Sequence, residues 1–331
     1  MSTVIGVLRK RFLAPSLASV GFTERGFPVT HTDATARLEA VPQAVVCGFE
    51  WAIEGASLWE LERRLALIEP EQRGFAYEGA TMGYTILDVM PGSGRDRTRE
   101  LLEGPARPHI FLSYIGIGFA MARLPRPLWK KVLPQLAGVT YHPTMSWLAV
   151  DGYGFDRAYF DTKRWVDEQA EPVPYPWAGR PDYFPRAFDQ GVGRALWFIH
   201  GGDPQAVADA VNRFAEGRRA DLWSGVGLAA TFAGGTDRSG LVRLRRLAGE
   251  YYRELALGVV FAVKARTYSS YVPEHTHLAS GVVTDLPVRA VENIADRTEA
   301  ADSDTGPVPP YELWRARIRA EFGSGALRTA S

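Results

Sequence analysis

Residues 114–120 read YIGIGFA, and 109 positions further on residues 223–229 read WSGVGLA. Each segment carries two glycines two residues apart, inside an apolar pattern that is typical of a buried helix. A glycine inside a helix costs about 1 kcal/mol relative to alanine, so a compensating interaction is expected. Either two helices approach each other closely at these glycines, or the backbone leaves room for a ligand. Close packing is the favoured interpretation, and a ligand channel is the alternative.

The glycine pairs belong to a longer internal similarity. The same two-residue spacing recurs at Gly152 and Gly154 and at Gly191 and Gly193. Short segments centred on Phe49, Phe155 and Phe261 follow each other at intervals of 106 residues, and residues 76–78 (AYE) match residues 187–189 (AFD) with a shift of 111. These ordered matches predict an internal tandem duplication, with a unit of roughly 106–111 residues present twice and the start of a third. Chance similarity among helices rich in glycine, alanine and aromatic residues is the alternative.

Helical periodicity dominates the rest of the chain. Leu58, Leu61, Leu65 and Ile68 share one helix face, and Asp203 has the character of a helix N-cap. Alternating strand patterns are scarce, so the sequence predicts an all-α fold, a multi-helix bundle. Helices are predicted for residues 33–55, 58–68, 71–90, 95–104, 108–124, 126–136, 144–169, 184–200, 204–214, 219–233, 239–270, 287–298 and 311–322.

Proline and small polar residues divide this helical chain. The predicted order is an N-terminal arm (1–32), a first helical repeat (33–170), a Pro-rich connector (171–183), a second helical repeat with the partial third unit (184–298), a flexible linker (299–310) and a C-terminal helix and tail (311–331). Because the two repeats interleave so regularly, we expect them to form one compact, pseudo-symmetric body. The C-terminal helix has an apolar face and should dock onto it.

Composition narrows the class of protein. The 331 residues contain 38 basic and 38 acidic side chains, and this zero net charge argues against a nucleic-acid partner. The longest nearly apolar run, Ile110 to Ala122, is too short to span a membrane, which takes about 20 residues. No signal peptide is evident, and a single cysteine, Cys47, excludes an internal disulfide. The expectation is a cytoplasmic protein that does not span a membrane.

Acidic residues on the matched helices are the first candidates for chemistry. Glu50 corresponds to Asp156, and Glu78 to Asp189, so these acids could converge between the repeats. Ion pairing with nearby arginines such as Arg194 is the favoured interpretation, and a substrate-binding or catalytic role for at least two acids is the alternative. No Glu-x-x-His element accompanies them, so no di-metal site and no other metal site is predicted. The candidate catalytic residues are Glu78, Asp156, Asp189, Arg194 and His275.

Other reactive side chains carry weaker signals. His275 and His277 follow Pro273, where a polar loop is the favoured interpretation and an acid or base role for a histidine the alternative. Cys47 lies in an apolar helical pattern and is expected to be an inert, buried thiol. No phosphate-binding loop or dinucleotide fingerprint is present, so the sequence identifies no cofactor.

Aromatic residues make up 11% of the chain, and many lie on the glycine-bearing helices. Core packing explains most of them. The alternative is that the aromatic residues line a long apolar cleft between the repeats, because ligand sites favour such interfaces. The candidate substrate-binding residues are Tyr77, Tyr114, Gly116, Gly118, Tyr153, Phe155, Phe188, Trp223, Gly225 and Gly227.

Four segments together carry a family resemblance: RGFAYEGA (73–80), YIGIG (114–118), DGYGF (151–155) and FDQGVGR (188–194). In this order they resemble the UnbL-type family, encoded beside enediyne polyketide synthases in actinomycetes, over roughly residues 8–295. Such proteins have a His-Thr-Glu segment followed by Ala-Cys near the end. Residues 275–279 here read HTHLA, so no role is carried over for that glutamate.

The resemblance implies a place in antibiotic biosynthesis rather than a reaction. It implies a protein required for enediyne core assembly that binds a linear polyene or polyyne polyketide intermediate and assists its conversion. A polyketide synthase or a membrane oxidase would be its protein partner. A non-catalytic carrier or scaffold for an apolar intermediate, and a helical protein-interaction module, are the alternatives. The sequence leaves open whether the protein is an enzyme.

Overall fold

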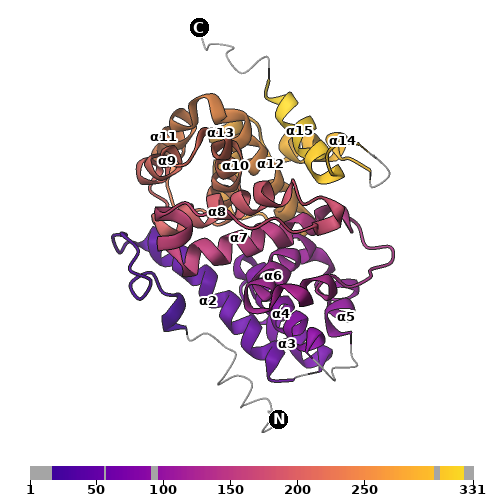
Figure 1. Cartoon of the computed structure of the whole chain (residues 1–331). Coiled ribbons are helices and arrows are strands. Elements are labelled where there is room, and N and C mark those ends of the chain that lie inside the picture. Colours follow the sequence, from indigo (N-terminus) through magenta and orange to yellow (C-terminus); the bar gives the residue numbers. More distant parts are fainter. Residues whose placement is uncertain (1–16, 56, 91–95, 302–305, 324–331) are drawn as a thin grey trace.

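The structure is a computed structural model that describes residues 17–55, 57–90, 96–301 and 306–323 (Figure 1). Within these ranges every regular element is a helix, which confirms the predicted all-α, multi-helix fold. The long helices are α2 (Asp33–Ile53), α3 (Leu58–Ala66), α4 (Pro70–Val89), α5 (Arg97–Glu103), α6 (Ile110–Arg123), α7 (Leu148–Phe160), α8 (Phe184–Ile199), α9 (Pro204–Arg213), α10 (Glu216–Phe232), α11 (Arg238–Ala248), α12 (Tyr252–Tyr268), α13 (Glu274–Thr284), α14 (Val288–Thr298) and α15 (Pro310–Glu321).

Short helices of other pitch connect the long ones. The 3₁₀ helices are η1 (Ala18–Val20), η2 (Arg107–His109), η3 (Arg126–Lys131), η4 (Thr144–Trp147), η6 (Trp177–Gly179) and η7 (Gly249–Tyr251), and η5 (Lys163–Asp167) is a π-helix. In the part of the chain that the structure describes, no helix combines the length and the apolar character needed to cross a bilayer.

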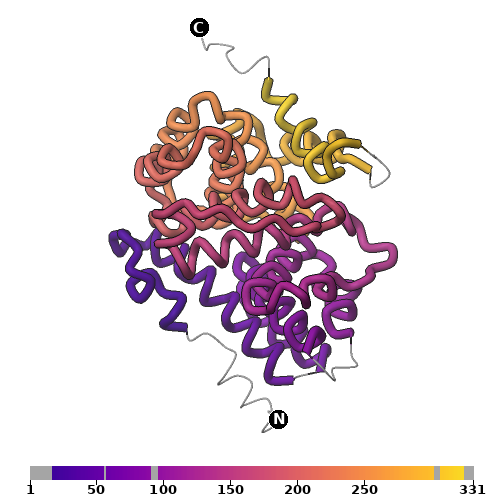
Figure 2. The backbone as a smooth tube through the Cα atoms, viewed as in Figure 1, coloured from indigo at the N-terminus to yellow at the C-terminus, as the bar shows by residue number. Residues whose placement is uncertain are grey.

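Seven central helices pack in chain order, each against the next: α2, α4, α6, α7, α8, α10 and α12. Figure 2 shows this progression, with α2 and α4 at one end of the molecule, α7 and α8 across its middle and α10 and α12 toward the other end. The remaining helices flank this series. One continuous hydrophobic core runs through all of it.

Glycine pairs create the crossings between central helices. Two positions two residues apart on a helix are separated by about 200° around its axis, so they face opposite sides. In α7, a Cβ at Gly152 would overlap the backbone of Ile115 in the preceding helix, and one at Gly154 would overlap Phe188 O in the following helix. The other pairs behave in the same way: the first glycine contacts the preceding central helix and the second contacts the following one. These pairs are Gly116 and Gly118, Gly191 and Gly193, and Gly225 and Gly227. The close-packing interpretation is therefore confirmed.

The packing pattern repeats with every central helix, because each one contacts the helix before it and the helix after it. Phe49, Phe155 and Phe261 lie on α2, α7 and α12, which are three central helices apart, so the spacing of 106 residues spans three crossings. Gly79 and Gly191 both face the preceding helix and differ by 112 positions. This register aligns Glu78 with Gln190, whereas the sequence match aligned Glu78 with Asp189. The duplicated unit of 106–111 residues stays a prediction.

Two peripheral segments are held by specific contacts. In the N-terminal arm, Phe22 and Phe27 are buried, and Tyr159 of α7 donates a hydrogen bond to Val20 O over 2.6 Å. The C-terminal helix α15 docks, as predicted, against α12 and α14 through its buried Trp314 and Ile318. Residues 1–16 of the arm, residues 302–305 of the predicted linker and residues 324–331 of the tail lie outside the described residues.

Three predicted helices are wrong in extent. The helix predicted for residues 239–270 is broken at Gly249, whose φ of 51° lies in the left-handed region that ends α11. The helix predicted for residues 144–169 is interrupted at Asp161, which leaves helical geometry with a ψ of 60°. The helix predicted for residues 126–136 shortens to the 3₁₀ turn η3.

The polar loop expected after Pro273 is a helix instead, α13. Pro273 precedes its first turn, where proline leaves no helical hydrogen bond unmade. The hydroxyl of Thr276 is fully buried and donates to Thr231 O over 2.9 Å, which fastens α13 to the end of α10. Tertiary packing thus explains why polar composition misled the prediction.

Candidate functional site

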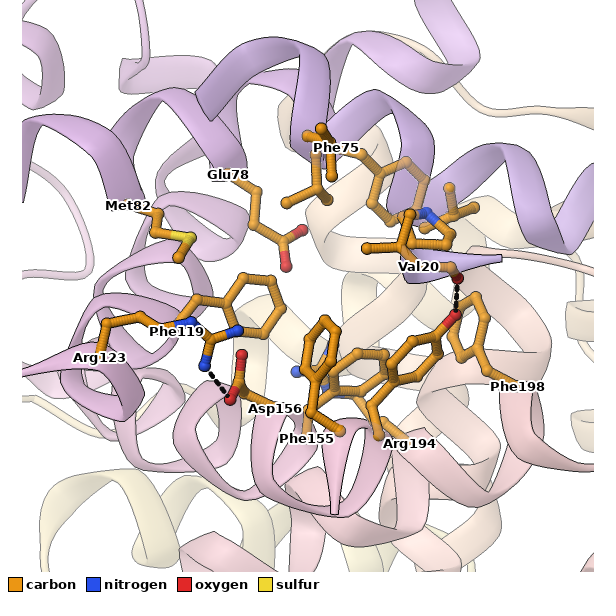
Figure 3. A pocket seen from close by; sticks show the side chains of 16 residues that line it. Val20, Phe75, Glu78, Met82, Phe119, Arg123, Phe155, Asp156, Arg194 and Phe198 are labelled. Atoms are coloured by element: carbon orange, nitrogen blue, oxygen red, sulfur yellow. Dashed lines mark hydrogen bonds and ion pairs between the residues drawn. The ribbon is translucent and has the colours of Figure 1, made fainter. Parts of the chain in front are cut away.

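A pocket opens between α2, α4, α6, α7 and α8 (Figure 3). We call it the outer pocket; it has a cavity volume of about 60 Å³ and opens to solvent. Its walls are mostly aliphatic and aromatic, and the half-buried Pro42, Val45 and Phe160 and the exposed Arg123 mark its mouth. The lining consists of Val20, Val41, Pro42, Val45, Val46, Phe75, Glu78, Met82, Phe119, Arg123, Phe155, Asp156, Tyr159, Phe160, Arg194 and Phe198.

A second pocket lies deeper, between α4, α6, α7, α8, α10 and α12. This inner pocket has a cavity volume of about 40 Å³, and apart from the half-buried Leu228 all its lining residues are buried. Three residues line both pockets: Phe75, Glu78 and Arg194. These three side chains therefore lie between the two pockets.

Glu78 is the central polar group of the site. It lies on α4, a helix that is buried from Gly74 to Leu87 because α2 and α6 pack closely on both sides of it. The carbonyl group of Glu78 abuts Gly116 of α6, and its side chain turns into the outer pocket (Figure 3). Only 3% of the residue is exposed. Among the described residues, none forms a hydrogen bond with its carboxyl group.

Burial controls the protonation of Glu78. Removal from water raises the pKa of this carboxyl to about 8, since the charged form is desolvated. The positive charge of Arg194 opposes this rise, and the negative charge of Asp151 adds to it. At neutral pH the side chain is therefore mainly a neutral carboxylic acid, able to donate a hydrogen bond.

Arg194 forms an ion pair with Asp151 of α7. Its Nε donates to Asp151 Oδ1 over 2.7 Å, and its Nη2 lies 2.6 Å from the same oxygen. The guanidinium also lies over the ring of Phe155, 4.9 Å from the centroid. Burial raises the pKa of Asp151, and Arg194 opposes this by favouring the carboxylate. This ion pair gives the site a fixed cation whose own charge is largely balanced.

Asp156 is also ion-paired. Arg123 Nη1 lies 2.7 Å from Asp156 Oδ1, at the side of the outer pocket (Figure 3). Burial raises the pKa of Asp156, and the arginines around it, Arg123 first, oppose the rise. Arg123 lies in addition 5.0 Å from the ring centroid of Phe160. The charged lining residues are therefore Arg123 and Asp156, which pair with each other, Arg194, which pairs with Asp151 outside the lining, and Glu78, which has no ion-pair partner among the described residues.

Two predicted catalytic residues lie outside both pockets. Asp189 accepts two hydrogen bonds from Arg218 of α10, at 2.9 and 2.7 Å, and burial raises its pKa to about 6. His275 lies at the start of α13, with Nε2 3.0 Å from Phe232 O and Nδ1 3.7 Å from Glu71. Burial lowers the pKa of His275, which favours its neutral form. The structure brings Glu78, Asp156 and Arg194 together and leaves Asp189 and His275 apart from them.

Of the predicted substrate-binding residues, Phe155 lines the outer pocket. Tyr77 stacks on His109, and the hydroxyl of Tyr114 lies 2.7 Å from His142 Nδ1. The other aromatic candidates pack in the core or against it, and the glycine candidates form helix crossings: Tyr153, Phe188, Trp223, Gly116, Gly118, Gly225 and Gly227.

Sequence reasoning missed most of the apolar wall, namely Phe75, Met82, Phe119 and Phe198, as well as Arg123. One signal for Arg123 was available: it is the first charged residue after the apolar run of residues 110–122. Cys47 is half-buried, whereas the prediction had it buried, and it does not line either pocket. In the described ranges, no three His, Cys, Asp or Glu side chains cluster as a metal site would require.

Comparison with known proteins identifies the family of the chain. The model of the family described as Protein of unknown function (DUF1702) matches residues 4–322. Neither the curated proteins nor the solved structures give a match. Because the family model covers nearly the whole length, the chain belongs to the DUF1702 family.

Proposed function

We propose that this protein binds an extended apolar small molecule in the outer pocket and that Glu78 donates a hydrogen bond, or a proton, to an oxygen of that ligand. One observation carries the proposal: a carboxyl group that is buried, has no hydrogen-bond partner among the described residues and is directed into a mostly apolar cavity. A buried polar group without a partner destabilises a fold by roughly 1–3 kcal/mol. A ligand oxygen at this place would supply the missing partner.

The walls support an apolar ligand. Aromatic and aliphatic side chains from five helices surround the cavity, and ligand sites in helical proteins are commonly built this way, with a few convergent polar groups. The two ion pairs satisfy most of the lining charge internally. A highly charged ligand would have to compete with those pairs, whereas a neutral chain would not.

The protonation state of Glu78 supports a role in chemistry as well as in binding. An acid transfers protons most efficiently when its pKa lies near the working pH, and the pKa of Glu78 is raised to about 8 by burial. A neutral carboxyl in an apolar site can activate a carbonyl group through a hydrogen bond, as buried acids in known enzymes do. Asp156 and Arg194, being ion-paired, would position Glu78 and the ligand.

A linear polyene or polyyne polyketide intermediate fits this description, and it is the ligand that the resemblance to the UnbL-type family implies. Under this proposal the protein acts in the cytoplasm during enediyne core assembly. A polyketide synthase or a membrane oxidase would supply or receive the intermediate. The lining of the outer pocket supports an apolar ligand, and the polyene or polyyne class rests on the resemblance alone.

A non-catalytic carrier is the second candidate, and the pairing of Asp156 and Arg194 favours it. Asp156 is paired with Arg123, and Arg194 with Asp151 although its Nη2 makes no hydrogen bond, so Glu78 is the one acid of the described lining without an ion-pair partner. The two candidates differ in the consequence of Glu78→Gln. A carrier should keep product formation in the coexpressed pathway, because glutamine retains the shape and a hydrogen bond, whereas an acid catalyst should lose it at least tenfold.

Binding can be tested with cis-parinaric acid, a conjugated tetraene fatty acid that fluoresces in apolar surroundings. We expect saturable binding to the full chain. Val45→Phe, which fills the mouth of the outer pocket, should weaken binding at least tenfold, and Val242→Phe on the exposed face of α11 should not. The proposal fails if the wild-type protein shows no saturable binding or if Val45→Phe leaves the affinity unchanged.

A further inference from the structure

We propose that the mouth of the outer pocket is an anion site, at which Arg123 binds a carboxylate group on the end of the ligand that faces solvent. The inference rests on the proposed function and adds the charge of that end of the ligand to it. It follows from the donors that Arg123 leaves unused and from the cations beside it.

Arg123 has unused hydrogen-bond donors at the mouth. It ends α6 and lines the outer pocket, and 34% of its side chain is exposed. Its Nη1 donates to Asp156 Oδ1 over 2.7 Å (Figure 3), whereas its Nε and Nη2 have no hydrogen-bond partner among the described residues. Two parallel N–H groups of a guanidinium bind a carboxylate most strongly, and Nε and Nη2 form such a pair. Arg123 can therefore bind a ligand carboxylate and keep Asp156.

Two further arginines add positive charge near Arg123. Arg25 of the N-terminal arm donates to Phe160 O, at the end of α7, over 2.6 Å. Arg157 of α7 donates to Ala122 O, near the end of α6, over 2.8 Å. Neither forms an ion pair with another described residue. The guanidinium groups of Arg25 and Arg123 lie 5.1 and 5.0 Å from the ring centroid of Phe160, so both stand beside the mouth.

Cations outnumber carboxylates in this part of the wall. The three arginines all oppose the rise that burial causes in the pKa of Asp156. Glu39 of α2 and Arg25 act in opposite directions on the pKa of Tyr159, which also lines the pocket. Among the groups that act on these two wall residues, three are thus cations, against the carboxylates of Asp156 and Glu39. This excess of positive charge favours a ligand with one negative charge at the mouth.

The cavity places the charged end of the ligand at the mouth. Its volume of about 60 Å³ holds only a short apolar segment, so the rest of the ligand stays where the pocket opens to solvent. Deeper in the pocket the cation is Arg194, which is already paired with Asp151. A carboxylate there would lose its water and would lie beside the acid Glu78, whereas at Arg123 it keeps contact with solvent.

Octanoate, methyl octanoate and octylamine test this inference, because they share an eight-carbon chain and differ in the charge at its end. Each is used to displace cis-parinaric acid from the full chain at pH 7. We expect octanoate to bind at least about tenfold more tightly than its methyl ester, as a charge-assisted pair with arginine implies, and octylamine to bind most weakly. Asp156→Asn removes the competing charge and should increase the preference for octanoate. Equal affinities of octanoate and its ester in the wild-type protein overturn the inference.

Variants of Arg123 assign the preference to this residue. Arg123→Lys keeps a cation beside Asp156 but lacks the two parallel N–H groups, so the preference for octanoate over its ester should fall by about threefold or more. Arg123→Gln combined with Asp156→Asn removes both charges and should abolish the preference while the ester still binds. Arg99→Gln, at an exposed ion-paired arginine of α5, is the control and should keep it.

The outcomes separate this inference from the proposed function. An octanoate preference that survives in the Arg123→Gln, Asp156→Asn protein contradicts the anion site. Equal binding of octanoate and its ester contradicts it as well and leaves the proposed function standing. If cis-parinaric acid itself does not bind to the wild-type chain, the proposed function fails together with the inference.

Discussion

Arg194 donates its Nε hydrogen to Asp151 over 2.7 Å, whereas no hydrogen bond joins it to Glu78, the acid that lines the same two pockets. Both partners are buried, so their attraction is weakly screened. As a result Glu78, which lines the same two pockets as Arg194, receives only the longer-range field of the cation and stays protonated at neutral pH.

Asp151→Asn should allow Arg194 to pair with Glu78 in place of Asp151. Without the Asp151 charge, Arg194 lacks its carboxylate partner, and the negative charge that raises the pKa of Glu78 is also removed. We expect the pKa of Glu78 to fall by one unit or more toward the ordinary range, because a nearby free cation favours the carboxylate. Carbon NMR of labelled glutamate side chains measures the shift. An unchanged pKa would show that Asp151 does not control Glu78.

Glu78 should make stability depend on pH. Its pKa is raised from the usual 4.5 to about 8 in the folded protein, so between these values the folded state keeps a proton that the unfolded chain has released. The free energy of unfolding therefore falls as the pH rises through this window, by about 1.4 kcal/mol per unit of pKa difference, a few kcal/mol in total. Glu78→Gln removes this loss.

Urea unfolding of both proteins at several pH values checks this expectation. The stability of Glu78→Gln relative to wild type should increase by a few kcal/mol between about pH 5 and pH 8 and then level off. The exposed Glu274→Gln is the control. A constant difference between Glu78→Gln and wild type over this range would mean that Glu78 is ionised in the folded protein.

Glycine crossings should be intolerant of a single methyl group. A Cβ at Gly225 of α10 would overlap Gln190 O of α8, so the two helices must separate. We expect Gly225→Ala to destabilise the fold by about 3 kcal/mol or more despite the better helix propensity of alanine. Gly217, on the same helix, has nothing near its Cβ position, and Gly217→Ala should raise stability by up to about 1 kcal/mol. Equal effects of the two changes, measured by urea unfolding, would contradict the crossing model.

A buried polar network should hold the C-terminal helix. Arg315 of α15 binds Glu312 at 3.0 Å and Asp221 of α10 at 3.2 Å, and the hydroxyl of Tyr311 donates to Gln190 of α8 over 3.0 Å. Arg315→Leu leaves two buried carboxylates with fewer partners, a change that costs about 3–5 kcal/mol. Hydrogen exchange should accelerate in α15 first, and the exposed Arg289→Leu on α14 should have little effect. Unchanged protection of α15 would rule out the network as its anchor.

The sequence predicted the fold class and the reason for the glycine pairs, because both are local properties. Two glycines two residues apart within an apolar helical pattern already imply two opposite close contacts. What it lacked was the register of those contacts. Gly79 directly follows Glu78, whereas Gly191 lies two positions after Asp189, so the two acids point in directions about 100° apart around their helices.

That rotation explains why Glu78 belongs to the site and Asp189 does not. Glu78 turns into the cavity, while Asp189 meets Arg218, which stands 29 positions away on α10 and carried no sequence signal. The loop predicted around His275 rested on polar composition. The segment is helical instead, and α13 is fastened by the hydrogen bond from Thr276 to the end of α10. Pairings across helices of this kind depend on tertiary geometry that spacing alone does not define.

The most direct test of the account is the titration of Glu78 itself. Carbon NMR of protein labelled at the glutamate carboxyl groups, with Glu78→Gln to assign the resonance, follows its protonation from acid to alkaline pH. The account predicts a carboxyl group that is still protonated at pH 7 and titrates near pH 8. A resonance that titrates near 4.5, the ordinary value for glutamate, would contradict the claim that the pocket holds a neutral acid.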